Sequence, residues 1–478
     1  MSMVSNLLEL PEIKYIHFTG IGGISMSGLA EILLSFGYRI SGSDIKSTNI
    51  TKKLSDLGVE FHAFHSEENV KDQDLLVHTA AVKENNPEII KAKKLGIPVI
   101  DRASLLGQIM RRYPYSIAVS GTHGKTTTTS MISTIMIKSG KNPTIHIGGE
   151  LDIIGGNTKV GGNKYFITEA CEYVESFLKF NPFLGIILNI DLDHVDYFRD
   201  LEHIKEAFLK FARLIPEDGY LVACMDDPNA ASLIDKVNCN RITYGIKSTS
   251  PVWSVDNIIF DGLGCASFNI LKDRRVLCNV KLSVPGIHNV SNALAAAAAC
   301  SVAGCETADI KEGLEKFKGA RRRFELKGTV NNIKVIDDYA HHPAEIKATL
   351  KAAKNCRHER IWCVFQPHTY TRTKLLLDEF STAFNDADTV IVSDIYAARE
   401  TDTGEIHSTA LVERINLHSG NAVYKHGFDA IVEYLAGNVL QGDLIITMGA
   451  GDIYKVGEMF LKESGKTAST FLRQPWQT

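Results

Sequence analysis

Apolar and polar positions follow one another in a repeated unit along the chain. In each unit a short apolar run leads into a polar loop and then into a helical pattern. The first run covers residues 14–18, and its loop, residues 19–23, opens a helical pattern that continues to about residue 36. A second run ends at Ser120, and a helical pattern continues from its loop through Lys138. Alternating strands and helices predict parallel sheets, whose ligands bind at the carboxyl ends of the strands.

The last third of the chain repeats the unit and predicts a sheet of its own. Its apolar runs cover residues 333–336, 361–365, 389–393 and 444–448. Residues 240–285 differ, because their short strand-like runs are separated by Gly and Asn turns. That pattern predicts a small β subregion within the middle of the chain.

Two breaks in the pattern predict three domains, and the length of 478 residues agrees at ~150 residues per domain. The breaks lie at residues 111–114 and 318–323. We therefore expect an α/β protein with domains at 1–112, 113–320 and 321–478.

The composition is that of an ordinary globular protein, with 44% hydrophobic and 23% charged residues. A formal net charge of −4 favours neither nucleic acid nor an anionic membrane as a partner. No apolar run approaches the ~20 residues that cross a bilayer, and residues 1–12 lack the features of a secretory signal. Nine scattered cysteines without C-x-x-C spacing are typical of reduced thiols, so we expect a cytoplasmic protein.

The loop after the second apolar run has the composition of a phosphate-binding loop. The residues that we expect to bind ATP there are Gly121, Thr122, His123, Gly124, Lys125, Thr126 and Thr127. In such loops backbone N–H groups bind phosphate oxygens, a Lys reaches the terminal phosphates and a Thr hydroxyl ligates Mg²⁺. Val119 stands where the usual spacing has a first Gly, and the alternative is a Gly-rich turn that caps an ordinary helix. The central domain is therefore expected to be a parallel sheet of the P-loop ATPase type.

Acidic and polar side chains follow other apolar runs of the central domain. Glu169 ends one run, and a polar cluster follows the next. The cluster contains Asn189, Asp191, Asp193, His194 and Asp196. Mg²⁺ takes hard oxygen ligands, often one or two carboxylates with phosphates, so the predicted metal ligands are Thr126, Glu169 and, at a second metal site, His194. The alternative for the cluster is an N-cap ahead of the helix that begins near Leu201.

The glycine-rich loop of the first domain is typical of a Rossmann-like, nucleotide-binding domain. Gly20, Gly22 and Gly23 follow a strand, Ser25 stands where the usual pattern has a third Gly, and Asp44 ends the next strand. A helix N-terminus of this kind fits a nucleotide diphosphate, so we expect these residues to bind a nucleotide-linked substrate. One alternative is a packing turn without a ligand. Another is an NAD-dependent dehydrogenase, which leaves the second, Lys-containing loop unexplained.

Two further clusters lie near the second domain break. Asn289 and Asn292 share a helix face, where amides suit hydrogen bonds to a base, a ribose or a phosphate. A helix N-cap is the alternative for one of them. Arg322 and Arg323 lie at the break itself, where a cation suits a phosphoryl group bound between domains. A solvated basic linker is the alternative for this pair.

The Rossmann-like last domain carries polar side chains where its predicted strands end. Asp338 and the pair His341 and His342 follow one strand, and His368 and Arg372 follow another. Arg binds carboxylates through two parallel hydrogen bonds, so His368 and Arg372 predict a site for a small carboxylate. The His pair is compatible with a metal, but its adjacency and the following Pro favour a contact with adenine or phosphate.

Taken together, these residues resemble the Mur ligase family of cell-wall peptide synthetases over essentially the whole chain. The motifs that carry the resemblance are residues 121–128, Glu169, residues 189–194, His288-Asn289-x-x-Asn292, Arg323-Phe324 and Asp338. Further motifs are similar to those of the family members that act on L-alanine: Gly-Ile-Gly-Gly-Ile-Ser-Met-Ser-Gly, Ser-Gly-Ser-Asp, Asp-Asp-Tyr-Ala-His-His-Pro and Gln-Pro-His-x-Tyr-Thr-Arg.

The resemblance implies an ATP-dependent ligation in peptidoglycan synthesis. ATP phosphorylates the carboxylate of UDP-N-acetylmuramate, and L-alanine attacks the acyl phosphate to give UDP-N-acetylmuramoyl-L-alanine, ADP and phosphate. The implied catalytic residues are Lys125, His194, Arg323 and Asp338. Two metal sites for Mg²⁺, or Mn²⁺, are also implied.

The resemblance also assigns the substrates to particular residues. The N-terminal glycines with Ser25 and Asp44 would bind the UDP moiety, and His368 and Arg372 would bind the alanine carboxylate. Asn292 would contact ATP together with Arg323 and Asp338, and Asn289 would contact the substrate. A ligase that joins UDP-N-acetylmuramate to a recycled tripeptide, and a non-catalytic nucleotide switch, are the alternatives. We expect a monomer or a homodimer.

Overall fold

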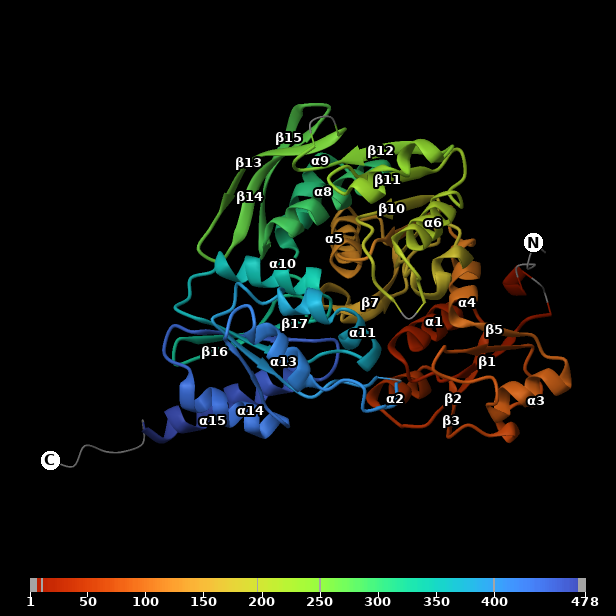
Figure 1. The fold of residues 1–478 in the computed structure, drawn as a ribbon. Helices are drawn as coiled ribbons and strands as arrows, with labels where there is room; N and C mark the ends of the chain where they lie inside the picture. The colour runs from red at the N-terminus through yellow and green to blue at the C-terminus, as the bar shows by residue number, and fades with distance from the viewer. Residues whose placement is uncertain (1–6, 10–11, 196, 249–250, 399, 472–478) are drawn as a thin grey trace.

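The computed structural model describes residues 7–9, 12–195, 197–248, 251–398 and 400–471. Its strands form three sheets, each flanked by helices, so the predicted three-domain α/β fold is confirmed (Figure 1). The domain limits near residues 112 and 320 stay predictions. Among the described residues, no helix combines the length and apolarity needed to cross a bilayer.

The N-terminal sheet has five parallel strands in the order β3-β2-β1-β4-β5. Strand β1 leads into the glycine-rich loop and β2 ends at Asp44, so both carboxyl ends lie at one edge of the sheet. Its elements are β1 Tyr15–Thr19, α1 Ile24–Ser35, β2 Arg39–Asp44, α2 Asn49–Asp56, β3 Glu60–Ala63, β4 Leu75–His78, α3 Pro87–Leu95, β5 Val99–Asp101 and α4 Arg102–Met110, with short 3-10 helices η1 Leu7–Glu9 and η2 Glu67–Asn69.

The central sheet has ten strands in the order β15-β14-β13-β12-β11-β10-β6-β9-β7-β8. The predicted β subregion extends this sheet, because β13 pairs with β12 and continues into the antiparallel strands β14 and β15. The strands are β6 Tyr115–Ser120, β7 Thr144–Leu151, β8 Gly156–Lys159, β9 Tyr165–Glu169, β10 Leu184–Ile187, β11 Tyr220–Cys224, β12 Asn240–Tyr244, β13 Trp253–Phe260, β14 Cys265–Lys272 and β15 Arg275–Pro285. The helices are α5 Lys125–Lys138, α6 Leu201–Ala212, α7 Pro228–Ala231, α8 Ile287–Val302 and α9 Thr307–Lys316, with 3-10 helices η3 Asp152–Ile154, η4 Tyr173–Lys179 and η5 Ile234–Lys236.

Helix α5, which begins in the phosphate loop, is held by two closely packed neighbours. Residues 293–299 of α8 have no exposed surface, since their small side chains let α8 approach the sheet and α5. A Cβ added at Gly313 of α9 would lie 2.5 Å from Cα of Ile135 in α5, so only glycine fits at this crossing. This packing fixes the position of the helix that presents the loop.

The C-terminal sheet has six strands in the order β16-β17-β21-β18-β19-β20, with β16 antiparallel to β17 and the other pairs parallel. The four strands predicted from apolar runs are present, and β16 and β20 flank them at the two edges. The elements are β16 Glu325–Val330, β17 Ile333–Asp338, α10 Pro343–Lys354, β18 Ile361–Phe365, α11 Tyr370–Leu375, α12 Leu377–Ser381, β19 Thr389–Val392, α13 Ser408–Asn416, β20 Ala422–Tyr424, α14 Phe428–Asn438, β21 Leu444–Met448 and α15 Tyr454–Phe471.

The central unit contacts both of its neighbours. Helix α1 packs on β7 and β8, and Nδ2 of Asn157 donates to the carbonyl oxygen of Ile24 at 3.0 Å. On the other side α10 lies below α8 in Figure 1, and Leu263 and Cys356 form an isolated antiparallel bridge. The loops at the carboxyl ends of the central strands therefore lie between the two outer units.

Candidate active site

The phosphate loop joins β6 to α5, as the sequence predicts. Two glycines take backbone angles that side chains disfavour, with φ of 143° at Gly121 and 87° at Gly124. The loop is tied to the next strand end, because Oδ1 of Asn189 accepts from the His123 amide at 2.8 Å and its Nδ2 donates to the His123 carbonyl at 3.0 Å. The Thr122 hydroxyl lies 2.9 Å from the amide nitrogen of Asp191, from which it accepts. Residues 189–191 therefore fix the shape of the loop.

Lys125, the first residue of α5, is held inside its own loop. Its Nζ donates to the carbonyl oxygens of Gly121 and Thr122, at 2.5 and 3.1 Å. It also forms an ion pair with Glu172, 2.9 Å from Oε2, and the Glu172 side chain has no exposed surface. Burial opposes the lysine charge, but the Glu172 carboxylate outweighs burial and raises the pKa of Lys125 above its ordinary value. Sequence reasoning missed Glu172, although it lies only three residues after Glu169.

Thr126 and Glu169 lie together, as expected for two ligands of one metal ion. Oγ1 of Thr126 donates to Oε2 of Glu169 at 3.0 Å, and Oε1 of Glu169 accepts from the Gly148 amide at 2.8 Å. These hard oxygen donors at the start of a phosphate-loop helix suit Mg²⁺. Their role as metal ligands stays a prediction.

His194, the residue predicted for a second metal site, lies beside Glu172. Its Nε2 is 3.8 Å from Oε1 of Glu172, and its ring centroid is 4.6 Å from that of Tyr173. The backbone is left-handed at His194, with φ of 51°. The N-cap alternative for the cluster is wrong, because Asp200 caps α6 by accepting from the His203 amide at 2.8 Å. Asp196 lies outside the described residues.

A cavity of about 460 Å³ opens between the phosphate loop, the N-terminal end of α8 and the C-terminal unit. Of the residues predicted to contact ATP or substrate, those that line it are His123, Gly124, Thr127, Asn289, Asn292, Arg323 and Asp338. Apolar side chains contribute too, among them Leu188, Phe317 and Phe324. The mixture of apolar walls and a few polar groups suits a purine nucleotide.

The two asparagines of α8 bond to each other rather than cap the helix. Nδ2 of Asn292 donates to Oδ1 of Asn289 at 3.1 Å, and Nδ2 of Asn289 donates to the Pro285 carbonyl at 2.7 Å. Gly286 occupies the N-cap position, so the N-cap alternative is wrong for both asparagines. A Cβ at Gly124 would lie 2.8 Å from Oδ1 of Asn292, which places this amide directly against the phosphate loop.

The residues around the second domain break are ordered. Arg322 donates through Nε to Asp337 at 2.9 Å and through Nη2 to the Gly449 carbonyl at 2.6 Å, so the alternative of a solvated linker is wrong for it. Arg323 lines the cavity, with its guanidinium 5.1 Å from the ring centroid of Tyr339. Asp338 also lines the cavity, and burial raises its pKa to about 6.

Arg372 reaches from the C-terminal unit to the central one. Its Nη2 lies 2.9 Å from Oδ1 of Asp193 in a buried ion pair, and its Nη1 lies 3.0 Å from Nδ1 of His368. Burial opposes the Asp193 charge, but Arg372 outweighs it and holds the pKa of Asp193 well below its ordinary value. The predicted alanine site thus contains a carboxylate of the protein itself.

In the first unit, the glycine-rich loop lies against Asp44 and against the central unit. The Gly22 amide donates to Oδ2 of Asp44 at 2.9 Å, and the Gly20 amide donates to the Ser43 carbonyl at 2.8 Å. Gly23 is the N-cap of α1 and has no side chain to cap it.

The Ser25 hydroxyl forms hydrogen bonds with the side chains of His146 and Arg102, two residues that sequence reasoning missed. Its Oγ lies 2.8 Å from Nε2 of His146 and accepts from Nη1 of Arg102 at 3.0 Å. Burial, helped by the Arg102 charge, lowers the pKa of His146 to about 3, so its imidazole is neutral. An Arg and a hydroxyl at a helix N-terminus form an arrangement that fits a diphosphate. Arg102 directly follows the short strand β5, whereas His146 comes from another domain.

Comparison with known proteins identifies the family. Residues 15–114 match the model for the Mur ligase family, catalytic domain, residues 119–300 that for the Mur ligase middle domain, and residues 322–451 that for the Mur ligase, glutamate ligase domain.

Individual relatives agree with these matches. The chain is 63% identical to a UDP-N-acetylmuramate–L-alanine ligase of Acetivibrio thermocellus over 97% of this chain and 99% of the relative. A solved UDP-N-acetylmuramate–alanine ligase of Thermotoga maritima is 31% identical, with a TM-score of 0.79 over 95% of this chain and 99% of that one. A murein peptide ligase of Psychrobacter arcticus is 25% identical, with a TM-score of 0.71 over the same shares. The chain belongs to the Mur ligase family.

Proposed function

We propose that this protein is an ATP-dependent ligase that joins L-alanine to the carboxylate of UDP-N-acetylmuramate. The observation that carries the proposal is the cavity between the phosphate loop and the C-terminal unit. His123, Arg323 and Asp338 line it, and the Lys125 loop lies at its edge. The relative from Acetivibrio thermocellus, which is named for this activity, supports the choice of substrates.

ATP occupies the cavity in this proposal. Backbone amides of residues 121–124 and the Lys125 ammonium bind the β- and γ-phosphates, and Asn292 contacts the nucleotide. Arg323 and Asp338 contact ATP from the C-terminal unit. Both reactants of the first step are anionic, so the protein acts mainly by neutralising charge and by positioning.

Mg²⁺ fits the donor set at the start of α5. Thr126 Oγ1 and Glu169 Oε2 are hard oxygen donors 3.0 Å apart, and the Gly148 amide orients the carboxylate. His194 would hold a second metal ion, Mg²⁺ or Mn²⁺. The bound ion would supply charge neutralisation to the phosphates.

The UDP-sugar occupies the first unit and brings its carboxylate to the phosphate loop. Gly20, Gly22, Gly23, Ser25 and Asp44 bind the UDP moiety, while Asn289 contacts the substrate. A carboxylate oxygen attacks the γ-phosphorus, and ADP leaves. The alanine amine then attacks the acyl carbon, phosphate leaves, and the amine loses a proton as the amide forms. His368 and Arg372 hold the alanine carboxylate.

Product analysis tests this function. The protein is mixed with ATP, Mg²⁺, UDP-N-acetylmuramate and either L-alanine or the murein tripeptide, and the products are identified by mass spectrometry. We expect UDP-N-acetylmuramoyl-L-alanine and ADP, formed only when ATP is present. Faster turnover with the tripeptide would contradict the proposal and identify the protein as the recycling ligase. Nucleotide binding without any amide product would replace it by the non-catalytic switch.

The cellular location, the domain limits and the oligomeric state of the protein stay predictions. The substrates are small molecules, and we expect the reaction to take place in the cytoplasm. Domain limits near residues 112 and 320 separate the UDP-sugar-binding, ATP-binding and amino-acid-binding parts. We expect a monomer or a homodimer, and size-exclusion chromatography with light scattering distinguishes the two.

A further inference from the structure

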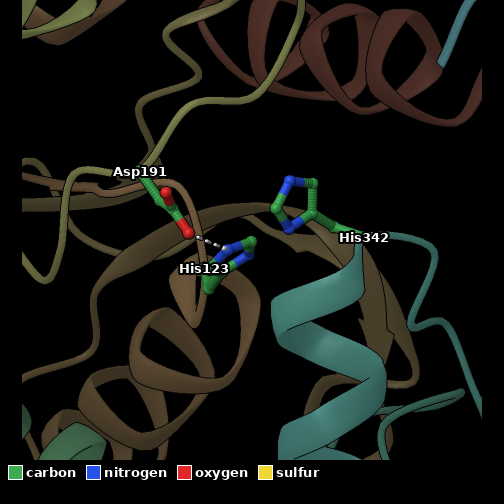
Figure 2. A group of neighbouring side chains, drawn as sticks. All are labelled: His123, Asp191 and His342. Carbon is green, nitrogen blue, oxygen red and sulfur yellow. Dashed lines mark ion pairs between the residues drawn. The ribbon is translucent and has the colours of Figure 1, made fainter. Parts of the chain in front are cut away.

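Three side chains from separate segments lie close together beside the cavity, which two of them, His123 and Asp191, line. Figure 2 shows His123 of the phosphate loop, Asp191 of the segment after β10, and His342 at the start of α10. One ligand-type atom from each lies within 4.8 Å of those from the other two. The segments belong to two domains, since His342 is in the C-terminal unit.

We propose that His123, Asp191 and His342 form a binding site for a zinc-class transition-metal ion that joins the phosphate loop to the C-terminal domain. This site is separate from the magnesium site assigned to Thr126 and Glu169. Two imidazoles and one carboxylate suit Zn²⁺, Co²⁺ or Ni²⁺, whereas Mg²⁺ prefers an all-oxygen set.

The His123 ring is already oriented for a metal. Its Nδ1 lies 3.2 Å from Oε1 of Glu345, a hydrogen bond that leaves Nε2 as the free nitrogen when the ring is neutral. Nε2 is buried without a hydrogen-bond partner among the described residues, and it lies 4.0 Å from Oδ2 of Asp191. A carboxylate that fixes a metal-binding histidine from its other nitrogen is a regular feature of zinc sites.

The site needs only small side-chain movements. Zn²⁺ binds nitrogen and oxygen at about 2.0–2.2 Å, which places tetrahedral ligand atoms about 3.4 Å apart. The Asp191 side chain retains 52% of its exposed surface, and its Oδ1 accepts from the Leu192 amide at 2.8 Å, so Oδ2 is the oxygen that would turn toward the ion. His342 at present contacts the Leu192 carbonyl through Nε2, at 3.2 Å, and accepts from the Ala344 amide through Nδ1, at 3.3 Å. Binding exchanges one of these long contacts for a metal bond.

Metal binding to the whole, metal-stripped protein tests the proposal. Zn²⁺ is titrated calorimetrically at mildly alkaline pH, without nucleotide and with excess Mg²⁺. We expect one site that Mg²⁺ does not displace, and a Tm that rises with Zn²⁺ because the ion binds the folded state. His342→Ala and Asp191→Asn should each lower the affinity at least tenfold. The matched control His426→Ala removes an exposed histidine of the same domain and should not.

Two controls separate this site from other places that take zinc. Zn²⁺ affinity unchanged in His342→Ala but lost in Glu169→Gln would put the ion at the magnesium site and overturn the proposal. Co²⁺ reports the ligand type, because thiolate ligation adds an intense near-ultraviolet charge-transfer band that imidazole and carboxylate ligation lack. Such a band would place the ion on cysteines and would equally overturn the proposal, as would no binding at all.

Discussion

Nζ of Lys125 lies 2.9 Å from Oε2 of Glu172, and the Glu172 side chain has no exposed surface. A phosphate-loop lysine is thus paired with a buried carboxylate. The same carboxylate lies 3.8 Å from Nε2 of His194. Phosphates that Lys125 binds would therefore compete with the Glu172 carboxylate for the ammonium.

Glu172→Gln should destabilise the nucleotide-free protein by about 2–4 kcal/mol, because removal of one partner leaves a mostly buried ammonium without its counter-charge. ATP analogues should then stabilise the variant more than the wild type, since the phosphates restore that charge. Denaturant unfolding with and without analogue measures both effects.

Glu175→Gln is the matched control for this substitution. Glu175 lies three residues after Glu172, in η4, but its partner Lys210 keeps 47% of its side chain exposed. We expect a change within about 0.5 kcal/mol. Equal losses of unfolding free energy in the two variants would mean that the buried Lys125–Glu172 pair stabilises the protein no more than an exposed pair does.

Lys125→Ala should reduce ATP-dependent ligation at least a hundredfold, because the ammonium neutralises charge on the transferred phosphoryl group. Turnover is measured as ADP release. The substitution also leaves Glu172 buried alone, so unfolding is recorded in parallel to separate lost chemistry from lost folding. More than a tenth of wild-type turnover in a folded variant would contradict the role assigned to Lys125.

Most of the architecture could be predicted from local patterns. The apolar runs at 333–336, 361–365, 389–393 and 444–448 became β17, β18, β19 and β21, since buried parallel strands are apolar on both faces. Edge strands do not share that property. β20 is only three residues long and half-buried, so its pattern was too short to detect.

Residues of the site could be predicted from the sequence only where a single continuous segment contains the whole motif. Gly121 to Thr127 form such a segment, and Thr126 meets Glu169 because parallel strands bring their ends to one edge. The contact of Ser25 with His146 joins residues 121 positions apart in different domains. No spacing rule predicts such a contact, because domain docking determines it.

Asp338 should make the stability of the protein depend on pH. Burial raises its pKa from an ordinary 3.8 to about 6, so the folded state holds this proton more tightly than the unfolded state. The stability that the protonated form contributes is fully present below about pH 4 and is lost as the pH rises through 6. Relative to Asp338→Asn, the wild type should lose about 2–3 kcal/mol of unfolding free energy between pH 4 and 7.

The Asp338 prediction is checked by urea unfolding of both proteins across this pH range. Asp235→Asn is the control, because the Asp235 side chain is 93% exposed. Its stability difference from the wild type should stay flat. A flat difference for Asp338→Asn as well would show that folding does not raise the pKa of Asp338.

Arg372→Lys should raise the KM for L-alanine about tenfold while leaving the KM for ATP unchanged. A lysine keeps the charge and can still pair with Asp193. It lacks the planar guanidinium that can bind the Asp193 and alanine carboxylates at the same time. Steady-state kinetics with each substrate varied in turn measure both constants. Arg414→Lys, which alters an exposed ion pair with Asp378, should change neither. Parallel rises in both constants would indicate a loosened domain contact rather than an alanine site.

Arg102→Ala should weaken binding of the UDP-sugar specifically. Nη1 of Arg102 donates to Oγ of Ser25 at 3.0 Å, which aims the guanidinium at the N-terminus of α1, where we place the diphosphate. Loss of a hydrogen bond to a charged group costs about 1.5–3 kcal/mol, so the KM for UDP-N-acetylmuramate should rise roughly 10- to 100-fold.

Three measurements decide whether Arg102 contacts this substrate. The KM for ATP should stay constant, because the phosphate loop lies in another unit. Arg112→Ala removes a cation that stacks on Phe36 just after the same helix, and it should leave both constants unchanged. Direct titration of the UDP-sugar, without ATP, should show the same loss of affinity in Arg102→Ala. If affinity is retained there while turnover falls, Arg102 acts on docking of the first domain through His146 and Ser25, not on the diphosphate.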